Sequence, residues 1–203
     1  VYMTMPREIA TLAGEMLRDP VQVSVAPVAT TAERVSQKVI LCDTSAKRDI
    51  LVELISQPDF KRTIVFTRTK RGADKVAVHL DKAGLSASAI HGNKSQNQRQ
   101  RALEEFRSGR IRVLVATDIA ARGIDIDGVT HVINYELPDV AESYVHRIGR
   151  TGRMGRTGLA ITFVSDLEDF EVLDAIKQKV GDQLEFSESS IYAQHFSSER
   201  SAV

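Results

Sequence analysis

Four consecutive Arg-x-Gly triplets occupy residues 147–158 and carry the clearest chemistry in this sequence. Their arginines are Arg147, Arg150, Arg153 and Arg156. The planar guanidinium group makes forked contacts with phosphate oxygens and keeps its charge at any working pH. Because four like charges at a fixed spacing repel one another, the run indicates a site for an anionic ligand.

Two other interpretations of this run are weaker. Disordered RNA-binding tails contain Arg and Gly runs, and collagen has glycine at every third position. The collagen interpretation lacks proline and a sustained repeat. The tail interpretation conflicts with apolar residues on both sides, since Tyr144 and Val145 precede the run and residues 159–164 form an apolar stretch after it. The sequence therefore favours a folded anion site.

The composition is that of a globular chain without overall charge. Of 203 residues 42% are hydrophobic, and 27 Lys and Arg balance 27 Asp and Glu. A nucleic-acid site must therefore come from local clustering of cations. The single Cys42 suits a reducing compartment, so we expect a cytoplasmic protein. No apolar run approaches the roughly 20 residues of a membrane span, so we expect no membrane partner.

Short runs rich in Val and Ile alternate with helical patterns. The predicted strands are residues 38–42, 63–66, 87–90, 112–116, 131–135 and 159–164, and the predicted helices are residues 47–55, 72–82, 96–107, 140–148 and 166–180. This order predicts an α/β fold with a mostly parallel sheet covered by helices on both faces. Residues 6–17 predict an extra N-terminal helix, and residues 21–36 are typical of a linker.

Polar residues follow several of the predicted strands. They are residues 67–70 and 91–94, Thr117 with Asp118, and Asn134. Because parallel strands end at the same edge of a sheet, these loops should converge there. The first two loops are basic, so the edge should be locally positive in a neutral chain. The alternative is that each loop is an ordinary solvated tip.

Four segments, in this order, resemble motifs of the C-terminal RecA-like half of a DEAD-box ATP-dependent RNA helicase of superfamily 2. They are Thr-Ile-Val-Phe-Thr at 63–67, His-Gly at 91–92 with Gln-x-x-Arg at 96–99, Ala-Thr-Asp-Ile-Ala-Ala-Arg-Gly-Ile-Asp at 116–125, and Tyr-Val-His-Arg-Ile-Gly-Arg-Thr-Gly-Arg at 144–153. The resemblance covers roughly residues 37–180, and the bacterial RhlE-like subgroup is the nearest one. It implies a RecA-like fold.

By this resemblance the nucleotide site contains Arg150, Arg153, Gly123 and Asp125. The two arginines are implied to be catalytic arginine fingers on the phosphates of ATP, a role worth roughly 10³–10⁵ in rate. The carboxylate of Asp125 is implied to accept hydrogen bonds from ribose hydroxyls. Two alternatives stay open: the arginines only pair with carboxylates, and Asp125 is a simple turn residue.

The residues implied to contact RNA follow a predicted strand or begin the next helix. They are Thr67, Arg68, His91, Gly92, Gln96, Arg99, Thr117 and Asp118. His146 and Arg147 are implied to close the interface with an amino-terminal RecA-like domain. Arg99 could equally be a solvated charge on its helix, and a lone histidine such as His146 is more often structural than a metal ligand.

Two features of ATP-hydrolysing enzymes are missing from this sequence. It has no G-x-x-x-x-G-K-[ST] loop to cradle phosphates and no Asp-Glu-Ala-Asp for magnesium. In the family both belong to the amino-terminal half, so Mg²⁺ is expected to bind there with ATP, and this chain alone is expected to be inactive. We expect residues 1–24 to be the end of that half and the linker, residues 25–181 the C-terminal RecA-like domain, and residues 182–203 a polar tail.

The implied function is ATP-driven unwinding of short RNA duplexes or remodelling of ribonucleoproteins. The expected partners are RNA, the amino-terminal RecA-like domain of the same protein, and a second copy of the chain through the N-terminal helix. One alternative is a RecA-like module that binds RNA or protein without catalysis. Another is a DNA helicase or excision factor of the same superfamily.

Overall fold

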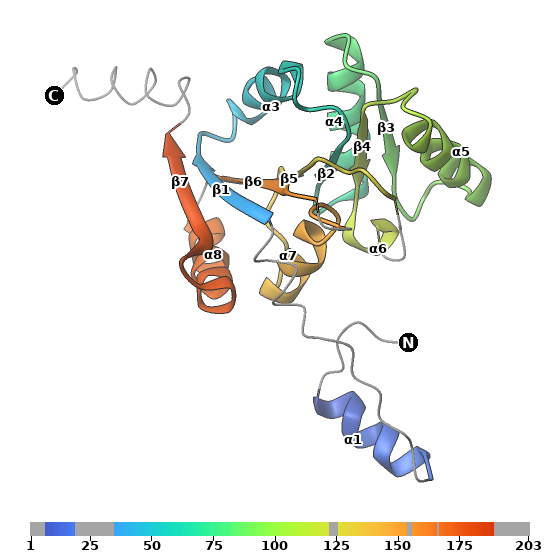
Figure 1. The fold of residues 1–203 in the computed structure, drawn as a ribbon, viewed down its shortest axis with the longest axis vertical. Coiled ribbons are helices and arrows are strands. Elements are labelled where there is room, and N and C mark those ends of the chain that lie inside the picture. Colours follow the sequence, from blue (N-terminus) through green and yellow to red (C-terminus); the bar gives the residue numbers. More distant parts are fainter. Residues whose placement is uncertain (1–6, 19–34, 122–125, 154–155, 166, 189–203) are drawn as a thin grey trace, which may run out of the picture.

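Seven parallel strands form a single sheet in the computed structural model, which describes residues 7–18, 35–121, 126–153, 156–165 and 167–188 (Figure 1). The strands are β1 (Val35–Leu41), β2 (Thr63–Phe66), β3 (Ala87–Ile90), β4 (Val113–Ala116), β5 (His131–Asn134), β6 (Gly158–Val164) and β7 (Leu184–Glu188). Their order in the sheet is β3-β4-β2-β5-β6-β1-β7. Every pairing is parallel, as the alternation of strands and helices predicted.

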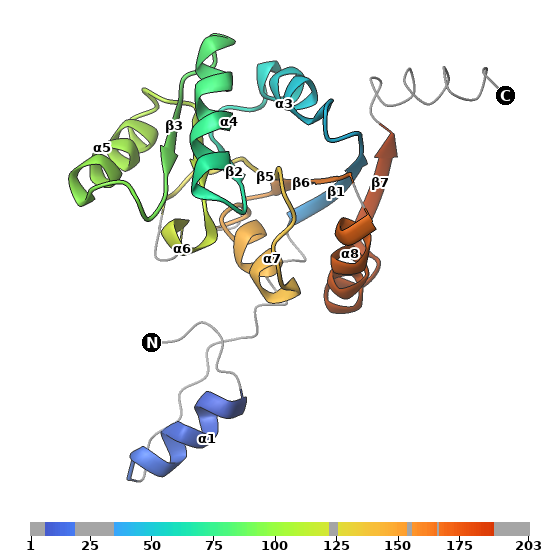
Figure 2. The same cartoon turned by 180° about the vertical axis from the view of Figure 1, so that it is seen from behind.

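Helices connect successive strands. They are α3 (Lys47–Ser56), α4 (Lys70–Lys82), α5 (Gln96–Arg107), α6 (Asp118–Ala121), α7 (Ala141–Ile148), α8 (Leu167–Val180) and the 3₁₀ turn η1 (Gly181–Gln183), while α1 (Arg7–Met16) precedes β1. On one face, α3 and α4 pack through residues such as Leu51 and Leu80 against Val65 and Ile133. Figure 2 shows this face, with α4 in front of the sheet.

The other face of the sheet is covered by α5 and α6 at one end and by α7 and α8 at the other. Phe106 of α5 packs with Ile64 and Leu114 of the central strands. Tyr144 of α7 and Ile176 of α8 pack with residues of β1 and β6. Neighbouring residues of the short central strands thus pack into cores on opposite faces of the sheet. For this reason the sequences of these strands are continuous apolar runs. The predicted fold class is confirmed.

The seventh strand corrects the expected domain boundary. We expected a polar tail from residue 182, but β7 adds to β1 with Leu184 opposite Gln37 and Phe186 opposite Val39. The apolar residues of this segment alternate with polar ones, which suits an edge strand with one face on the domain. The C-terminal domain therefore extends at least to residue 188.

The extra helix α1 is also present where the sequence predicted it. Leu12 and Met16 on this helix, and Leu17 just after it, are exposed. Self-association through this apolar stripe stays a prediction. No helix in the described part of the chain is long and apolar enough to cross a lipid bilayer.

Candidate functional site

The loops after four strands meet at one edge of the sheet, as predicted from their positions in the sequence. The backbone N–H of Thr67 donates to the carbonyl of Ala116, and that of Thr117 donates to the carbonyl of Ile90. The N–H of Tyr135 donates to the carbonyl of Phe66. These hydrogen bonds continue the ladder past the strand ends and bring the polar loops together at the carboxyl edge of the sheet.

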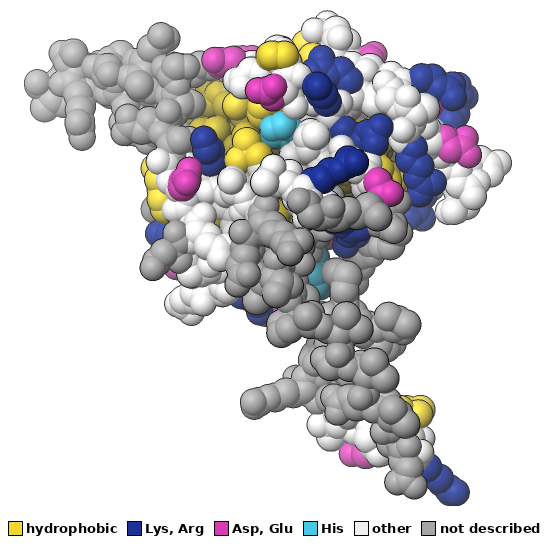
Figure 3. Space-filling model, in the orientation of Figure 1, with side chains coloured by type: hydrophobic (Ala, Val, Ile, Leu, Met, Phe, Trp, Pro, Cys, Tyr) yellow, Lys and Arg dark blue, Asp and Glu magenta, His cyan; other side chains and the backbone are white. Residues whose placement is uncertain are grey.

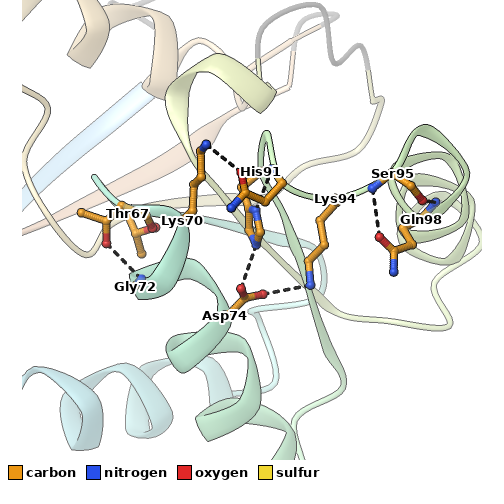
Figure 4. Close-up of polar contacts among 10 residues, drawn as sticks. Thr67, Lys70, Gly72, Asp74, His91, Lys94, Ser95 and Gln98 are labelled. Atoms are coloured by element: carbon orange, nitrogen blue, oxygen red, sulfur yellow. Dashed lines mark hydrogen bonds and ion pairs between the residues drawn. The ribbon is translucent and has the colours of Figure 1, made fainter.

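Side-chain contacts hold the loop after β3 against helix α4 (Figure 4). The buried His91 places Nε2 2.9 Å from Oδ2 of Asp74, and Lys94 places Nζ 2.9 Å from Oδ1 of the same carboxylate. Lys70 Nζ donates to Asn93 Oδ1 at 2.8 Å. Partial burial would raise the pKa of Asp74, but its hydrogen bonds from His91 and Lys94 outweigh this and hold that pKa below its ordinary value.

Two helices begin at this edge with well-formed caps. Thr69 Oγ1 accepts from the N–H of Gly72 at 3.0 Å at the start of α4. At the start of α5, Ser95 and Gln98 form a capping box, in which Ser95 N–H donates to Gln98 Oε1 at 2.9 Å (Figure 4). The amino ends of both helices therefore add partial positive charge to an edge that is already basic.

The residues expected to contact RNA are not equally accessible at this edge. Arg68, Gly92 and Gln96 are exposed. Arg99 is half-buried, and its Nε is buried without a hydrogen-bond partner. By contrast, Thr67 is fully buried and its hydroxyl donates to the carbonyl of Thr69 at 3.2 Å. A direct contact between that hydroxyl and RNA does not fit the structure, because Thr67 instead fixes the turn between β2 and α4.

His91 and Thr117 are also nearly enclosed, with 3% and 7% of their surfaces exposed. His91 uses one ring nitrogen on Asp74 and accepts from the N–H of Asn93 with the other. Its ring therefore shapes the loop that carries the exposed Gly92. Both His91 and Thr117 sit among the basic loops, whereas Arg68, Gly92 and Gln96 are the exposed members of the set expected to contact RNA.

Arg147, the first arginine of the triplet run, lies in the interior with 1% of its surface exposed. Its Nε and Nη2 donate to the two carboxylate oxygens of Asp118 at 2.6 and 2.7 Å. Its Nη1 donates to Asn134 Oδ1 at 3.3 Å and to the carbonyl of Glu136 at 2.6 Å. The guanidinium also lies over the ring of Phe66, 5.1 Å from its centroid.

These contacts give Arg147 and Asp118 a structural role within the domain. A residue that closes a domain interface must reach the surface, and the Arg147 guanidinium is enclosed by its own domain. Asp118 was expected to contact RNA; both of its oxygens accept from Arg147, its side chain is 32% exposed, and contact with RNA stays a prediction. The pair instead ties α7 to the carboxyl ends of β4 and β5. Its forked geometry makes it one of the stronger polar contacts in the domain.

The second and third arginines of the run are half-buried and are oriented by backbone carbonyls one turn earlier. Arg150 Nε donates to the carbonyl of His146 at 3.2 Å, and Arg153 Nε donates to the carbonyl of Gly149 at 2.8 Å. Arg150 also lines a small pocket with Asp118, Ala121, Ser143 and His146. Both guanidinium groups are thus pre-oriented, yet remain partly accessible.

Tight packing fixes the turn that carries these two arginines. Thr151 is buried, and its hydroxyl donates to the carbonyl of Val129 at 2.6 Å. Gly152 has a positive φ of 68°. A Cβ at Gly158 would lie 2.4 Å from Thr151 Oγ1 and 2.6 Å from the nitrogen of Gly152. Only glycine allows β6 to begin this close to the turn.

The fourth arginine, Arg156, is exposed, so the four triplets have three different surroundings. The other two residues expected at the nucleotide, Gly123 and Asp125, lie outside the described residues. Within the described part of the chain no group of His, Cys, Asp and Glu is arranged to hold a metal ion. What the structure does provide is a pair of oriented, accessible guanidinium groups, which fit the phosphates of a nucleotide.

Residues 46–155 match the family described as "Helicase conserved C-terminal domain". The chain belongs to this family. It is also 45% identical, over 175 residues, to DEAD-box ATP-dependent RNA helicase 21 of Oryza sativa subsp. japonica. That alignment covers 86% of this chain but 24% of the rice protein. This helicase C-terminal domain therefore spans about a quarter of the length of its relative.

Solved DEAD-box structures share the fold of this helicase C-terminal domain. Dbp5 of S. cerevisiae, bound to RNA and ADP BeF3, is 33% identical with a TM-score of 0.80, covering 95% of this chain and 51% of that one. The E. coli DEAD-box protein SrmB, bound to regulator of ribonuclease activity A, is 37% identical with a TM-score of 0.72, covering 75% of this chain and 90% of that one.

Three further residues support the site in this helicase domain, and of these only Asn134 was named from the sequence, as a polar residue after a predicted strand. Asp74 holds His91 and Lys94, while Asn134 and Glu136 contact Arg147. Glu136 Oε2 also accepts from the N–H of Arg68 at 2.7 Å. Glu136 follows a predicted strand, so the signal used for the other loops could have found it. Nothing in the sequence marks Asp74, which lies within a helix.

Proposed function

We propose that this chain is the C-terminal half of a DEAD-box ATP-dependent RNA helicase, of the bacterial RhlE-like subgroup, acting in the cytoplasm. In the whole protein, ATP turnover would drive local separation of RNA duplexes or remodelling of ribonucleoproteins. The observation that carries this proposal is that the burial of the arginines decreases along the triplet run. Arg147 is locked in the interior, while Arg150 and Arg153 are held by carbonyls and kept accessible.

The nucleotide half of the proposal depends on these two arginines. Their Nε contacts fix the direction of each guanidinium before a ligand arrives, so little reorganisation is needed when negative charge develops on phosphate oxygens. Mg²⁺ and the remaining phosphate contacts would come from an amino-terminal RecA-like domain of the same protein. The metal's contribution would be to neutralise charge on the phosphates.

The RNA half of the proposal depends on the carboxyl edge. Exposed Arg68 and Gln96, the half-buried Lys94 and the amino ends of α4 and α5 gather there. Backbone N–H groups, helix amino ends and cations are the groups that contact nucleic-acid phosphates independently of sequence. Such a surface suits an enzyme that acts on many RNA sequences.

The arginines provide the test. In the full-length protein, Arg150→Ala and Arg153→Ala should each lower RNA-stimulated ATP turnover by about 10³. Binding of a fluorescent ATP analogue should weaken far less, because a finger acts mainly on charge that appears in the transition state. Arg156→Ala is the matched control and should keep turnover within a few-fold of the unmodified protein.

The outcome that contradicts this assignment is equal damage from Arg153→Ala and Arg156→Ala, because the run would then act as one undifferentiated basic patch. Normal turnover in both Arg150→Ala and Arg153→Ala would favour a RecA-like binding module without catalysis. Circular dichroism of each variant would show that the fold is intact.

A further inference from the structure

We propose that a second RNA-binding surface lies at the amino ends of the central strands, opposite the carboxyl edge, and that it holds the phosphate backbone of RNA beyond the segment bound at that edge. Its residues are Lys61, Arg62, Arg110 and Arg156, named here the amino-end basic surface. The proposal rests on the proposed function, since it supposes that RNA is already held at the carboxyl edge.

Two guanidinium groups converge at the centre of the amino-end basic surface. Gly128 has a φ of 77°, and a Cβ placed there would lie 3.1 Å from Nη1 of Arg62 and 3.4 Å from Nη1 of Arg156. Arg62 is fixed in place, since its Nη1 donates to the carbonyl of Asp127 at 2.7 Å and its Nη2 to that of Arg107 at 3.1 Å. Arg156 therefore meets a cation that is held in place.

No carboxylate lies within ion-pair distance of these cations among the described residues. Lys61, Arg62, Arg110 and Arg156 form no ion pair there, whereas Lys94, Arg101 and Lys177 each form one. Lys61, Arg110 and Arg156 are exposed. In a chain with no net charge, unpaired cations that converge on one point create a local positive potential. An anion that bridges them would relieve their repulsion.

RNA fits this surface better than a protein partner does. The centre of a protein interface is usually apolar, but none of the large exposed hydrophobic side chains in the described residues belongs to this surface. Figure 3 shows several Lys and Arg side chains at the upper right, on the side of the molecule that carries α5, with a few Asp and Glu side chains among them. Lys and Arg side chains are among the groups that contact the nucleic-acid backbone.

The two RNA surfaces are close enough for a single strand to reach both. The central strands have four residues each, so the sheet is only about 13 Å long between its two edges, apart from the loops. Because helices cover both faces of the sheet, RNA that leaves the carboxyl edge would run along the outside of a helix such as α5, whose 12 residues span about 18 Å, to reach Arg156 and Arg62. A longer RNA would gain phosphate contacts that a short one lacks.

The experiment compares two RNAs in the full-length protein. One is the shortest single strand that fully stimulates ATP turnover, and the other is the same strand extended at its 5′ or its 3′ end. The variant combines Lys61→Ala, Arg110→Ala and Arg156→Ala, and leaves Arg62 in place because it holds the end of α5. By fluorescence anisotropy, affinity for one of the extended strands should fall on the order of tenfold, with a salt slope flatter by about 2.

The short strand should bind the variant as it binds the unmodified protein, and turnover at saturating short RNA should not change. A matched control combines Arg48→Ala, Lys75→Ala and Lys82→Ala, which removes the same charge from exposed positions on α3 and α4. This control should not weaken binding of the extended strand.

Three results would overturn the proposal. They are unchanged affinity for both extended strands, an equal loss for the short and extended strands, and an equal loss in the control variant. Unchanged affinity for both extended strands would indicate that the amino-end basic surface binds an acidic protein and not RNA. Failure of the proposed function looks different, because no RNA would then stimulate ATP turnover in the unmodified protein.

Discussion

Arg147 and Arg156 belong to the same repeated triplet, yet they differ in both burial and charge pairing. Arg147 is enclosed and meets a carboxylate, an amide oxygen, a carbonyl and an aromatic ring. Arg156 is exposed and meets another cation across Gly128. An arginine whose charge is matched inside the domain stabilises the fold, whereas one that is left unmatched at the surface is available to a ligand. Repetition in sequence therefore does not mean repetition in role.

Removing the enclosed arginine should have the largest effect on stability. Arg147→Leu leaves Asp118, Asn134 and the carbonyl of Glu136 without their donor, which should lower the free energy of unfolding by about 3 kcal/mol. Urea unfolding followed by circular dichroism measures this loss. Arg147→Lys should lose less, because it keeps the charge but not the fork. If Arg156→Ala costs as much as Arg147→Leu, the contrast between the two arginines is wrong.

A methyl group at Gly158 should have the next largest effect, because it tests the turn between the two arginines. The new Cβ would overlap Thr151 and the backbone of Gly152, so Gly158→Ala should lower the free energy of unfolding by about 2 kcal/mol. The same urea titration measures it. Gly109→Ala serves as a control, because nothing lies within 4 Å of a Cβ there and only its positive φ is penalised. A smaller loss at Gly158 than at Gly109 would contradict close packing of the turn.

Gly128→Ala tests the surroundings of the exposed Arg156. It should lower the free energy of unfolding by about 1 kcal/mol, because the backbone at Gly128 has a φ of 77°. The added methyl group would also push Arg62 and Arg156 apart. We therefore expect weaker binding of the extended RNA beyond the effect on stability. Thermal unfolding and fluorescence anisotropy on the same sample separate the two effects. Loss of stability with unchanged RNA binding would contradict a role for the converging guanidinium groups.

The smallest effect concerns pH at the amino end of β5. His131 stacks on Phe60 with ring centroids 3.8 Å apart, and burial lowers the pKa of His131 below 6.5. As the pH falls through about 6.5, His131 therefore takes up a proton in the unfolded chain before it does so in the folded domain. Stability from this residue is complete above that pH and falls as the pH drops below it. Urea midpoints in His131→Phe should vary less between about pH 5 and 7 than in the unmodified domain.

An unchanged pH dependence in His131→Phe would show that other groups titrate in this range. The variant keeps an aromatic ring against Phe60, so a large general loss of stability is not expected.

Much of the fold was predictable because its strands and helices have strong and different periodicities. The convergence of the loops at the carboxyl edge followed from the parallel sheet alone. Spacing of the arginines did not reveal which of them is buried. A signal was nonetheless present, because Tyr144, Arg147 and Ile148 lie three and four positions apart and share the apolar stripe of α7.

The strand β7 and the buried state of Thr67 were harder to foresee. Leu184 and Phe186 alternate over only five residues, which is too short a pattern to distinguish a strand from a polar tail. Thr67 looked like the other polar loop residues, but its position one residue past β2 places it under the turn that begins α4. In both cases tertiary contacts decide the outcome, and no local pattern records them.

The place of β1 in the sheet has a consequence for how the domain is made. Among the seven strands of this sheet β1 is the first to be synthesised, yet its two neighbours are β6 and β7, with Val35 opposite Gly158 and Gln37 opposite Leu184. The strands β2 to β5 are contiguous in both sequence and sheet. The strands β2 to β5 can therefore pair with one another during synthesis. In contrast, β1 can pair only after β6 and β7 have been made, more than a hundred residues downstream. Such long-range closure is slow, so completion of this sheet should limit the folding rate of the domain.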